Sequence, residues 1–144
     1  TSGQVRARSM NMEAQLERAL NAPAFGDWMD YVIGALQALA AHSGAPLPSG
    51  LDLTIGSTVP TGASVSSSAA LQIATLRAAT QAFGLDVSPE KLAQLAQSSE
   101  NNFVGVNCGL MDQMASSTGR PGSALFFDTL TLETTLETTP FRIG

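Results

Sequence analysis

The sequence contains little charge and few of the side chains that usually carry out acid–base or metal chemistry. Lys91 is its only lysine and His42 its only histidine, and the latter is expected at the surface at a helix end. Charged residues make up 13% of the chain, the net charge is −5, and no basic run occurs. These absences argue against nucleic acid or membrane partners, histidine catalysis and a zinc site. An anionic ligand would need backbone amides, a metal ion or a few placed cations.

Cysteine and long apolar runs are also scarce. Cys108 is the only cysteine, so an internal disulfide is excluded, which fits a reducing compartment. Without a nearby histidine partner, Cys108 is interpreted as a small buried filler and not as a nucleophile. No segment approaches the roughly 18 apolar residues of a membrane span, and no signal-peptide pattern occurs. The first residue is Thr1 and not methionine, which suggests a piece of a longer protein.

The residues that are present predict one packed domain of the α+β class. Apolar residues make up 44% of the 144, enough for a core. The periodicity predicts strands and helices over these ranges: strands at Val5–Met12 (an edge strand), Leu51–Ile55, Ala124–Phe127 and Thr131–Leu136; helices at Asp27–His42, Ala69–Phe83 (buried nearly all round), Pro89–Ser99 and Leu110–Ser116. Met12–Leu20 is equally compatible with a short helix, and Asn101–Gly109 is expected to be a loop.

The segment from Pro60 to Ala70 connects a strand pattern to a helix pattern through small residues. Unpaired N–H groups and the helix dipole favour an anion at such a helix start, so the segment is a candidate phosphate loop. A flexible serine–glycine loop followed by a helix cap is the other interpretation. The segment matches neither the P-loop nor the dinucleotide-binding glycine motif.

Two acidic residues are candidates for chemistry. Asp112 follows Gly109 at the start of a short predicted helix, where it is either a catalytic carboxylate or an acid that offsets the helix dipole. Glu100 is either a ligand for Mg²⁺ or ATP, or a surface acid at a helix end.

The Pro60–Ala70 segment resembles the phosphate-binding signature of the GHMP small-molecule kinases, and the galactokinase version most closely. Phe103–Gln113 and Ala124–Asp128, the latter running on to Leu132-Glu133, resemble galactokinase segments in the same order. Trp28 with Tyr31-Val32 and Gly34 also looks like that family, although both aromatic residues are most simply core. The resemblance spans nearly the whole chain. It implies the fold of the GHMP-kinase N-terminal domain (ribosomal protein S5 domain 2-like), in partial form.

The resemblance also implies a function: a cytoplasmic galactokinase-like enzyme that uses ATP and Mg²⁺ to phosphorylate the anomeric hydroxyl of a sugar. Asp112 matches the family's catalytic aspartate, and Gly109 lies where the sugar approaches the backbone. Ser67, Ser68 and Glu100 are the candidate Mg²⁺ ligands. The residues implied in ATP and phosphate binding are Pro60, Gly62, Ala63, Ser64, Ser66, Ser67, Ser68 and Ala69.

The sequence departs from the family pattern in two respects. Ser64-Val65 stands where the family usually has Gly-Leu, and a side chain there could crowd the phosphates. The family's N-terminal sugar-binding motif and its C-terminal glycine-rich motif are not found in residues 1–144. The chain is therefore expected to be a partial N-terminal domain that alone binds nucleotide weakly and shows negligible kinase activity. A kinase for another sugar, such as arabinose or a uronic acid, and a non-catalytic sugar and ATP sensor are the alternatives.

Overall fold

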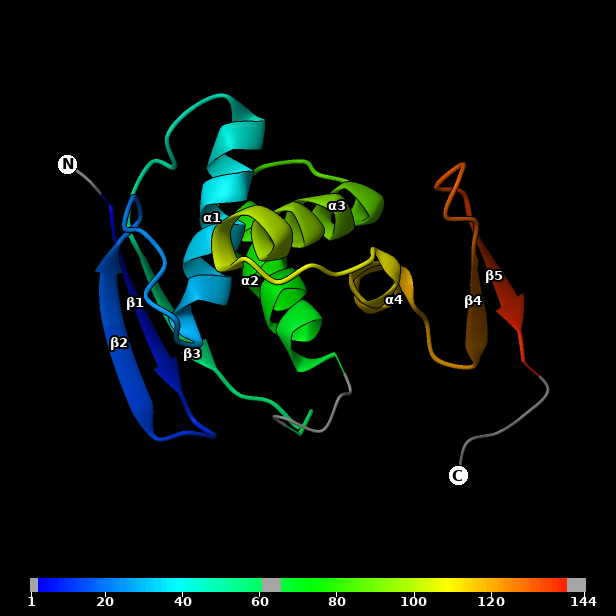
Figure 1. Cartoon of the computed structure of the whole chain (residues 1–144), viewed down its shortest axis with the longest axis horizontal. Coiled ribbons are helices and arrows are strands. Elements are labelled where there is room, and N and C mark those ends of the chain that lie inside the picture. Colours follow the sequence, from blue (N-terminus) through cyan, green and yellow to red (C-terminus); the bar gives the residue numbers. More distant parts are fainter. Residues whose placement is uncertain (1–2, 61–65, 140–144) are drawn as a thin grey trace.

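The chain forms a small sheet with helices on one face and a separate hairpin at the far end (Figure 1). The computed structural model describes residues 3–60 and 66–139. Its strands are β1 (Gln4–Ser9), β2 (Ala14–Ala19), β3 (Leu51–Ile55), β4 (Ser123–Phe127) and β5 (Thr134–Thr138). Its helices are α1 (Met29–Ser43), α2 (Ser67–Phe83), α3 (Pro89–Ser99) and α4 (Met111–Thr118), with a π-helical turn η1 (Glu100–Val104). The presence of both helices and strands, without regular alternation between them, confirms the α+β prediction.

The sheet has the strand order β2-β1-β3. Strand β1 is antiparallel to β2 and parallel to β3, with Ala7 opposite both Leu16 and Leu53. The prediction of an edge strand for Val5–Met12 is therefore wrong, because β1 is paired on both sides. The short helix considered for Met12–Leu20 is also wrong. A turn in which Glu13 has a φ of 48° reverses the chain, and Ala14–Ala19 pairs as a strand.

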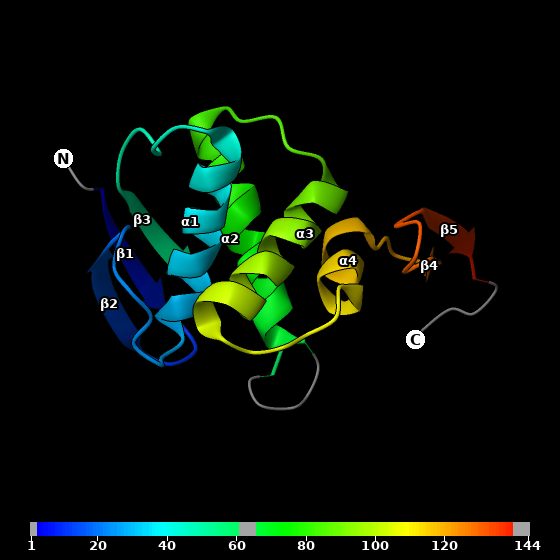
Figure 2. The same ribbon diagram turned by 45° about the horizontal axis from the view of Figure 1, so that its top comes forward.

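The core lies between the inner face of the sheet and the helices. Side chains along β1 point alternately to the two faces of the sheet, which buries Val5 and Ala7. These two residues pack with apolar residues of α1, α2 and α3. In Figure 2, α1 lies next to the sheet, and α2, α3 and α4 follow at increasing distance from it. Members of this core from the three helices are Val32, Ile33, Leu36, Leu39, Ile73, Leu76, Ala79, Leu92 and Leu95.

Helices α2 and α3 begin and end close to their predicted limits. The Ser88 hydroxyl accepts a hydrogen bond from the Lys91 N–H at 3.2 Å and caps α3, whose first turn holds Pro89 and Glu90. However, α2 is not buried all round, since Ala74 and Ala78 are exposed on its outer face. Alanine is compatible with either environment, so composition alone overstated the burial of this helix.

The segment after α3 is helical where a loop was expected. The chain continues from α3 into η1, and Gly105, with a φ of 84°, ends the turn. The N–H groups of Gly105 and Val106 both donate to the Glu100 carbonyl at 3.0 Å. This geometry buries Glu100, which is 4% exposed, so the interpretation of Glu100 as a surface acid is wrong.

The β4–β5 hairpin is antiparallel, with Leu125 opposite Leu136. Its second strand begins at Thr134, three residues later than predicted. The reason is a turn in which the Asp128 carboxylate accepts hydrogen bonds from the N–H groups of Leu130 (2.8 Å) and Thr131 (3.1 Å). Across residues 3–60 and 66–139, none of the helices has the length and apolar character needed to cross a bilayer.

Candidate functional site

A cavity of about 430 Å³ opens where the ends of β1 and β3 meet the starts of α1 and α2. The strand ends contribute mainly small and polar residues, and the helix starts contribute aromatic, aliphatic and hydroxyl side chains. Its lining residues are Ser9, Asn11, Met12, Trp28, Tyr31, Ile55, Gly56, Ser57, Thr58, Val59, Ser67, Ser68, Ala70, Leu71 and Ala74. A partly apolar hollow with a few polar groups is the usual form of a small-molecule site.

The rim of the cavity is held by Asn11, in the turn after β1. Its side-chain amide donates to the Ser57 carbonyl at 2.6 Å, and its oxygen accepts from the Ser57 N–H at 2.8 Å. The Met10 N–H donates to the Ile55 carbonyl at 2.9 Å and extends the pairing beyond the strands. These bonds fix the turn and the segment after β3 as one rigid edge. Nothing in the sequence pattern singled out Asn11.

Trp28 and Tyr31 form the aromatic wall of the cavity. Both are half-buried, and Trp28 also packs against the core, so their interpretation as core residues alone is incomplete. Burial raises the pKa of Tyr31, and the nearby charges of Glu100 and Asp30 add to the increase. One sequence signal was available: the only tryptophan and the only tyrosine are spaced three residues apart at a helix start.

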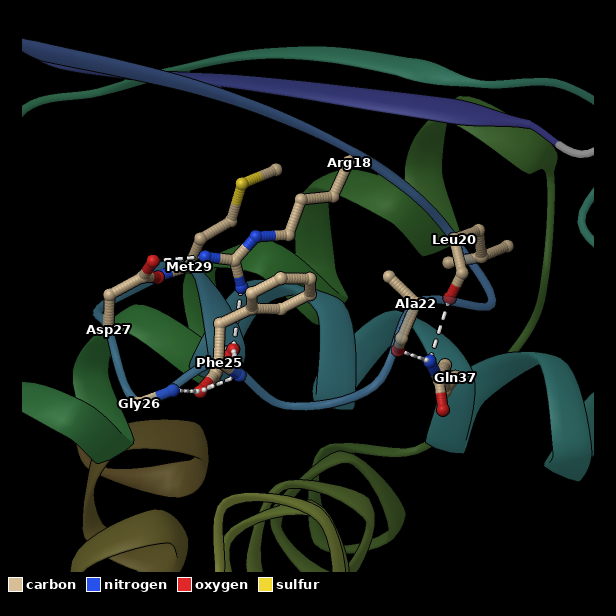
Figure 3. Close-up of polar contacts among 9 residues, drawn as sticks. Arg18, Leu20, Ala22, Phe25, Gly26, Asp27, Met29 and Gln37 are labelled. Atoms are coloured by element: carbon tan, nitrogen blue, oxygen red, sulfur yellow. Dashed lines mark hydrogen bonds and ion pairs between the residues drawn. The ribbon is translucent and has the colours of Figure 1, made fainter.

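The strap that leads into this wall, residues 20–28, is held by a buried ion pair (Figure 3). The Arg18 guanidinium donates to Asp30 at 2.6 Å and also pairs with Asp27, while the Phe25 ring lies 4.3 Å from it. The Asp30 carboxylate also accepts from the N–H groups of Phe25 (3.0 Å) and Gly26 (2.6 Å). Burial alone would raise the pKa of Asp30, but these amides and Arg18 outweigh it and hold that pKa below its usual value.

The predicted phosphate segment is only partly described. Gly62, Ala63 and Ser64 lie outside the described residues, whereas Pro60 is described and exposed. Ser66 precedes α2 with a φ of 59°, a left-handed conformation that is uncommon for serine. Of the remaining predicted residues, Ala69 is buried at 1% exposure. Ser67 and Ser68 form the first turn of α2 and line the cavity. Among the described residues, no side chain caps this helix start.

A second polar cluster surrounds Glu100. The Gln113 amide donates to the Glu100 carboxylate at 3.0 Å and also contacts the Cys108 sulfur at 3.4 Å. Burial raises the pKa of the Cys108 thiol, and the charges of Glu100 and Asp112 add to the increase. The thiol therefore stays protonated at neutral pH, which argues against a nucleophile, although Cys108 is half-buried and not fully buried as predicted. The sequence did not single out Gln113.

Asp112 and Gly109 lie at the edge of this second cluster. Asp112 is exposed in the first turn of α4, immediately before the buried Gln113. A Cβ added at Gly109 would meet nothing within 4 Å, so the backbone there is open to solvent. The described lining of the cavity does not include Glu100, Gly109 or Asp112. The structure thus brings the predicted residues into two clusters and not one.

Helix α2 and Tyr31 connect the two clusters. Gln72 follows Ser68 by one helical turn on the same face, and its amide lies 3.5 Å from the Ser99 hydroxyl. The face of α2 that begins at Ser68 is therefore packed against the residue that precedes Glu100. Tyr31 lines the cavity, and the charge of Glu100 contributes to the rise in the pKa of Tyr31. The clusters are neighbours that share this wall.

The donor set suits Mg²⁺ better than a transition metal. No group of three or more His, Cys, Asp or Glu side chains gathers within the described part of the chain. Glu100 is a buried carboxylate, and the ion pairs formed by the described residues do not involve it. A buried carboxylate without a basic partner favours a cation. Mg²⁺ is typically held by one or two carboxylates, hydroxyls, waters and substrate phosphates, so Glu100 in one cluster and Ser67 and Ser68 in the other are residues of the right chemical kind.

Comparison with known proteins identifies relatives of this fold. Residues 30–120 match the family model described as "GHMP kinases N terminal domain". The chain is 39% identical over 106 residues to a galactokinase of Thermosipho africanus, covering 74% of this chain and 30% of the relative. It is 42% identical over 98 residues to an L-arabinokinase of Arabidopsis thaliana, covering 68% of this chain and 9% of the relative.

The fold also matches a solved structure. Lactococcus lactis galactokinase complexed with galactose superimposes with a TM-score of 0.89 at 28% sequence identity, covering 98% of this chain and 37% of that one. The chain spans about a third of the length of the curated galactokinases it matches.

Proposed function

The chain belongs to the GHMP kinase family, and on this premise we propose that it serves a galactokinase-like, ATP-dependent sugar 1-kinase. The observation that carries the proposal is the position of the cavity beside the start of α2. A hollow with an aromatic wall can take a nucleoside, and the adjoining helix start can take its phosphates. The galactokinases of Thermosipho africanus and Lactococcus lactis support the same class.

The nucleotide is proposed to enter with its base against Trp28 and Tyr31. The phosphates then lie at the start of α2, where the N–H groups of a first helical turn and the hydroxyls of Ser67 and Ser68 are the natural donors. The proposed contacts are those predicted from the sequence: Pro60, Gly62, Ala63, Ser64, Ser66, Ser67, Ser68 and Ala69. Of these, Ser67 and Ser68 line the cavity.

Ser67, Ser68 and Glu100 are proposed to hold Mg²⁺. When bound, the ion neutralises charge on the β- and γ-phosphates. Glu100 contributes a carboxylate that the Gln113 amide orients at 3.0 Å. Among the described residues, no ion pair occupies this carboxylate, so it remains available as a ligand.

Asp112 is proposed to act on the sugar. Its exposed carboxylate accepts or orients the proton of the anomeric hydroxyl, whose oxygen attacks the γ-phosphorus as the bond to the ADP oxygen breaks. The open backbone at Gly109 leaves room for the sugar ring. Phosphoryl transfer asks mainly for positioning and charge neutralisation, so one carboxylate, a phosphate cradle and Mg²⁺ are a sufficient minimum.

The sugar is proposed to be galactose, the ligand that the Lactococcus lactis structure names. Because the chain spans about a third of its curated relatives, we interpret residues 1–144 as part of a GHMP-kinase N-terminal domain. Further contacts to the sugar would then come from elsewhere in such a kinase. A cytoplasmic location remains a prediction of the resemblance.

The test has a binding stage and a turnover stage. Isothermal titration of the purified chain with ATP and Mg²⁺ should give saturable binding, and Glu100→Gln should weaken the Mg²⁺ dependence of that binding. The complete polypeptide encoded by its gene should then produce ADP and sugar 1-phosphate, followed by ³¹P NMR, from a panel containing galactose, arabinose, glucose and a uronic acid. Galactose is expected to give the highest kcat/KM.

Two results would contradict the proposal. Absence of ATP binding at millimolar ligand would remove the nucleotide site. Binding of ATP and sugar without any product from the complete polypeptide would indicate a sensor.

A further inference from the structure

We propose that the ion pair of Arg18 with Asp30 and Asp27 sets the position of the Trp28 ring, so that Arg18 and Asp30 are positioning residues for nucleoside recognition. The inference rests on the proposed function, because it takes the cavity to be the nucleoside site. The juxtaposition that carries it is one guanidinium bound to two carboxylates, at positions 27 and 30, that flank the cavity residue Trp28 in the chain. Neither residue itself lines the cavity.

The strap of residues 20–28 has no regular structure and depends on side chains to fix its path. Its first half is held by Gln37 of α1, whose amide donates to the carbonyls of Leu20 at 2.8 Å and Ala22 at 2.9 Å (Figure 3). These bonds anchor the start of the strap, and none of the three residues lines the cavity. They leave the position of its last residue, Trp28, to be fixed by other contacts.

The second half of the strap is held by Asp30. Its side chain is 2% exposed, and it accepts the N–H groups of Phe25 and Gly26 as well as Arg18. The Arg18 side chain is 10% exposed, and the Phe25 ring lies over its guanidinium. Because the pair is largely shielded from water, its hydrogen bonds are strong and directional.

The two carboxylates bound by Arg18 stand on either side of Trp28 in the chain. Asp27 precedes it and accepts the Met29 N–H at 2.9 Å, while Asp30 follows it in the first turn of α1. One guanidinium from β2 therefore fixes the backbone on both sides of the cavity tryptophan. The ring of Trp28 is held in place before any ligand arrives, and such preorganisation improves affinity by lowering the ordering cost of binding.

A purely stabilising role explains this arrangement less well. A buried ion pair contributes little net stability compared with apolar residues of similar volume. Its distinctive property is geometric, because the two-pronged guanidinium imposes one relative position on β2, the strap and α1. The same chain offers a matched surface pair for comparison: Arg6 of β1 bonds Glu17 at 3.3 Å and Asp52 at 3.2 Å, with its side chain 48% exposed.

The experiment compares two ligands that share phosphates but differ in the nucleoside. Isothermal titration measures the affinity of the 144-residue chain for ATP and for tripolyphosphate, both with Mg²⁺, in wild type, Arg18→Met and the control Arg6→Met. We expect Arg18→Met to weaken ATP binding about tenfold and to change tripolyphosphate binding by less than about twofold, as loss of a preorganised wall predicts. Arg6→Met should match wild type for both ligands.

A milder variant protects the test against misfolding. Asp27→Asn keeps an oxygen for the Met29 N–H but loses the charge that Arg18 binds, and it should weaken ATP binding selectively by a smaller factor. In the ligand-free protein, acrylamide should quench the fluorescence of Trp28, the only tryptophan, more strongly in Arg18→Met and in Asp27→Asn than in wild type.

The outcomes separate the inference from the function on which it rests. If the wild-type chain binds ATP but Arg18→Met and Asp27→Asn bind it equally well, or lose both ligands in equal proportion, the inference is wrong while the nucleotide site stands. If the wild-type chain binds neither ligand, the proposed function fails and the inference fails with it.

Discussion

Three carboxylates of this chain differ at the scale of single residues because of their surroundings. Asp30 is buried and paired with Arg18, Glu100 is buried and bonded to an amide, and Asp112 is exposed. The first arrangement suits a structural anchor, because its charge is already neutralised. The second suits a cation ligand. The third suits a group that must reach a substrate hydroxyl.

Replacing Asp112 with asparagine should remove catalysis and spare nucleotide binding. The amide cannot accept the proton of the sugar hydroxyl, so kcat of the complete polypeptide should fall by about 10²–10⁴-fold. The Kd for MgATP should stay within about twofold, because Asp112 lies outside the described cavity lining. Coupled ADP release and titration calorimetry measure the two effects. Asp86→Asn, an exposed loop acid, is the control, and retained turnover in Asp112→Asn would refute the base assignment.

Acid should destabilise the protein partly through Asp30. Its pKa is lower in the folded chain than in the unfolded one, so its stabilising contribution is complete above the unfolded value of about 3.9 and is lost as pH falls below it. The free energy of unfolding, from urea titrations between about pH 6 and 3, should therefore fall less steeply in Asp30→Asn than in wild type. Asp52→Asn, whose side chain is 77% exposed, should retain the wild-type slope. Equal slopes in all three proteins would contradict the prediction.

At the scale of elements, helices with clear signals were predictable and contacts between distant segments were not. Helix α3 was predictable from its apolar period and from Ser88 and Pro89 at its start. Strand β3 was predictable from the alternation of Leu51, Leu53 and Ile55 with polar residues. Central placement of β1 depends on a partner 46 residues away, which local pattern does not encode. The burial of Glu100 depends on a π-helical turn, and sequence period does not reveal such a turn.

The site was predictable to a similar extent. Motif similarity selected Asp112 and the start of α2, and position before the Asp112 segment suggested Glu100, but neither gave distances between them. Asn11 and Gln113 escaped prediction because each acts through a long-range hydrogen bond and neither belongs to a residue type that signals chemistry. Trp28 and Tyr31 were assigned to the core because a helix face that lines a cavity has the same apolar period as one that is packed.

Helix α1 crosses the α3–η1 junction closely at Gly34. A Cβ added there would lie 2.5 Å from the Ser99 hydroxyl and 2.8 Å from Phe103 Cδ1, too close for both. Gly34→Ala should therefore destabilise the chain by about 1–3 kcal/mol through overpacking, measured by urea denaturation. Gly109→Ala, whose Cβ would meet nothing within 4 Å, is the matched control for stability. If Gly34→Ala were as stable as wild type, α1 could move away from Ser99 and Phe103 without a loss in the free energy of unfolding, and the prediction would be wrong.

Gln113 links α4 to η1 through Glu100. Gln113→Leu removes the amide that bonds the buried carboxylate and should lower the free energy of unfolding by about 1–3 kcal/mol. Adding Glu100→Gln removes the unpaired charge and should recover part of that loss, so the double-mutant cycle should be clearly non-additive. Thermal and urea denaturation of the four proteins measure the coupling. Additive effects would show that the 3.0 Å contact contributes nothing of its own.

At the scale of the whole molecule, the β4–β5 hairpin is set apart from the main body (Figure 1). Its outer side chains are open to solvent, with Phe126 67% and Leu130 91% exposed. A two-stranded hairpin with little apolar cover is marginally stable in water.

Hydrogen exchange should therefore divide the chain into two parts. Amides of β4 and β5 should exchange at least tenfold faster than those of β1, whose strand is paired on both sides. Mass spectrometry of peptic fragments after timed labelling gives both rates in one sample. Equal protection of the hairpin and of β1 would show that the two parts open together.

The parallel pairing of β1 with β3 also predicts the order in which this protein folds. Because the β1–β2 hairpin is local and the β1–β3 connection encloses the whole of α1, we expect the hairpin to close before β3 joins. The Asn11–Ser57 bonds at the cavity rim depend on that late, non-local step. A nucleotide bound at the proposed site would therefore contact a surface that exists only after this pairing has formed. It should therefore slow the unfolding rate and leave the refolding rate nearly unchanged.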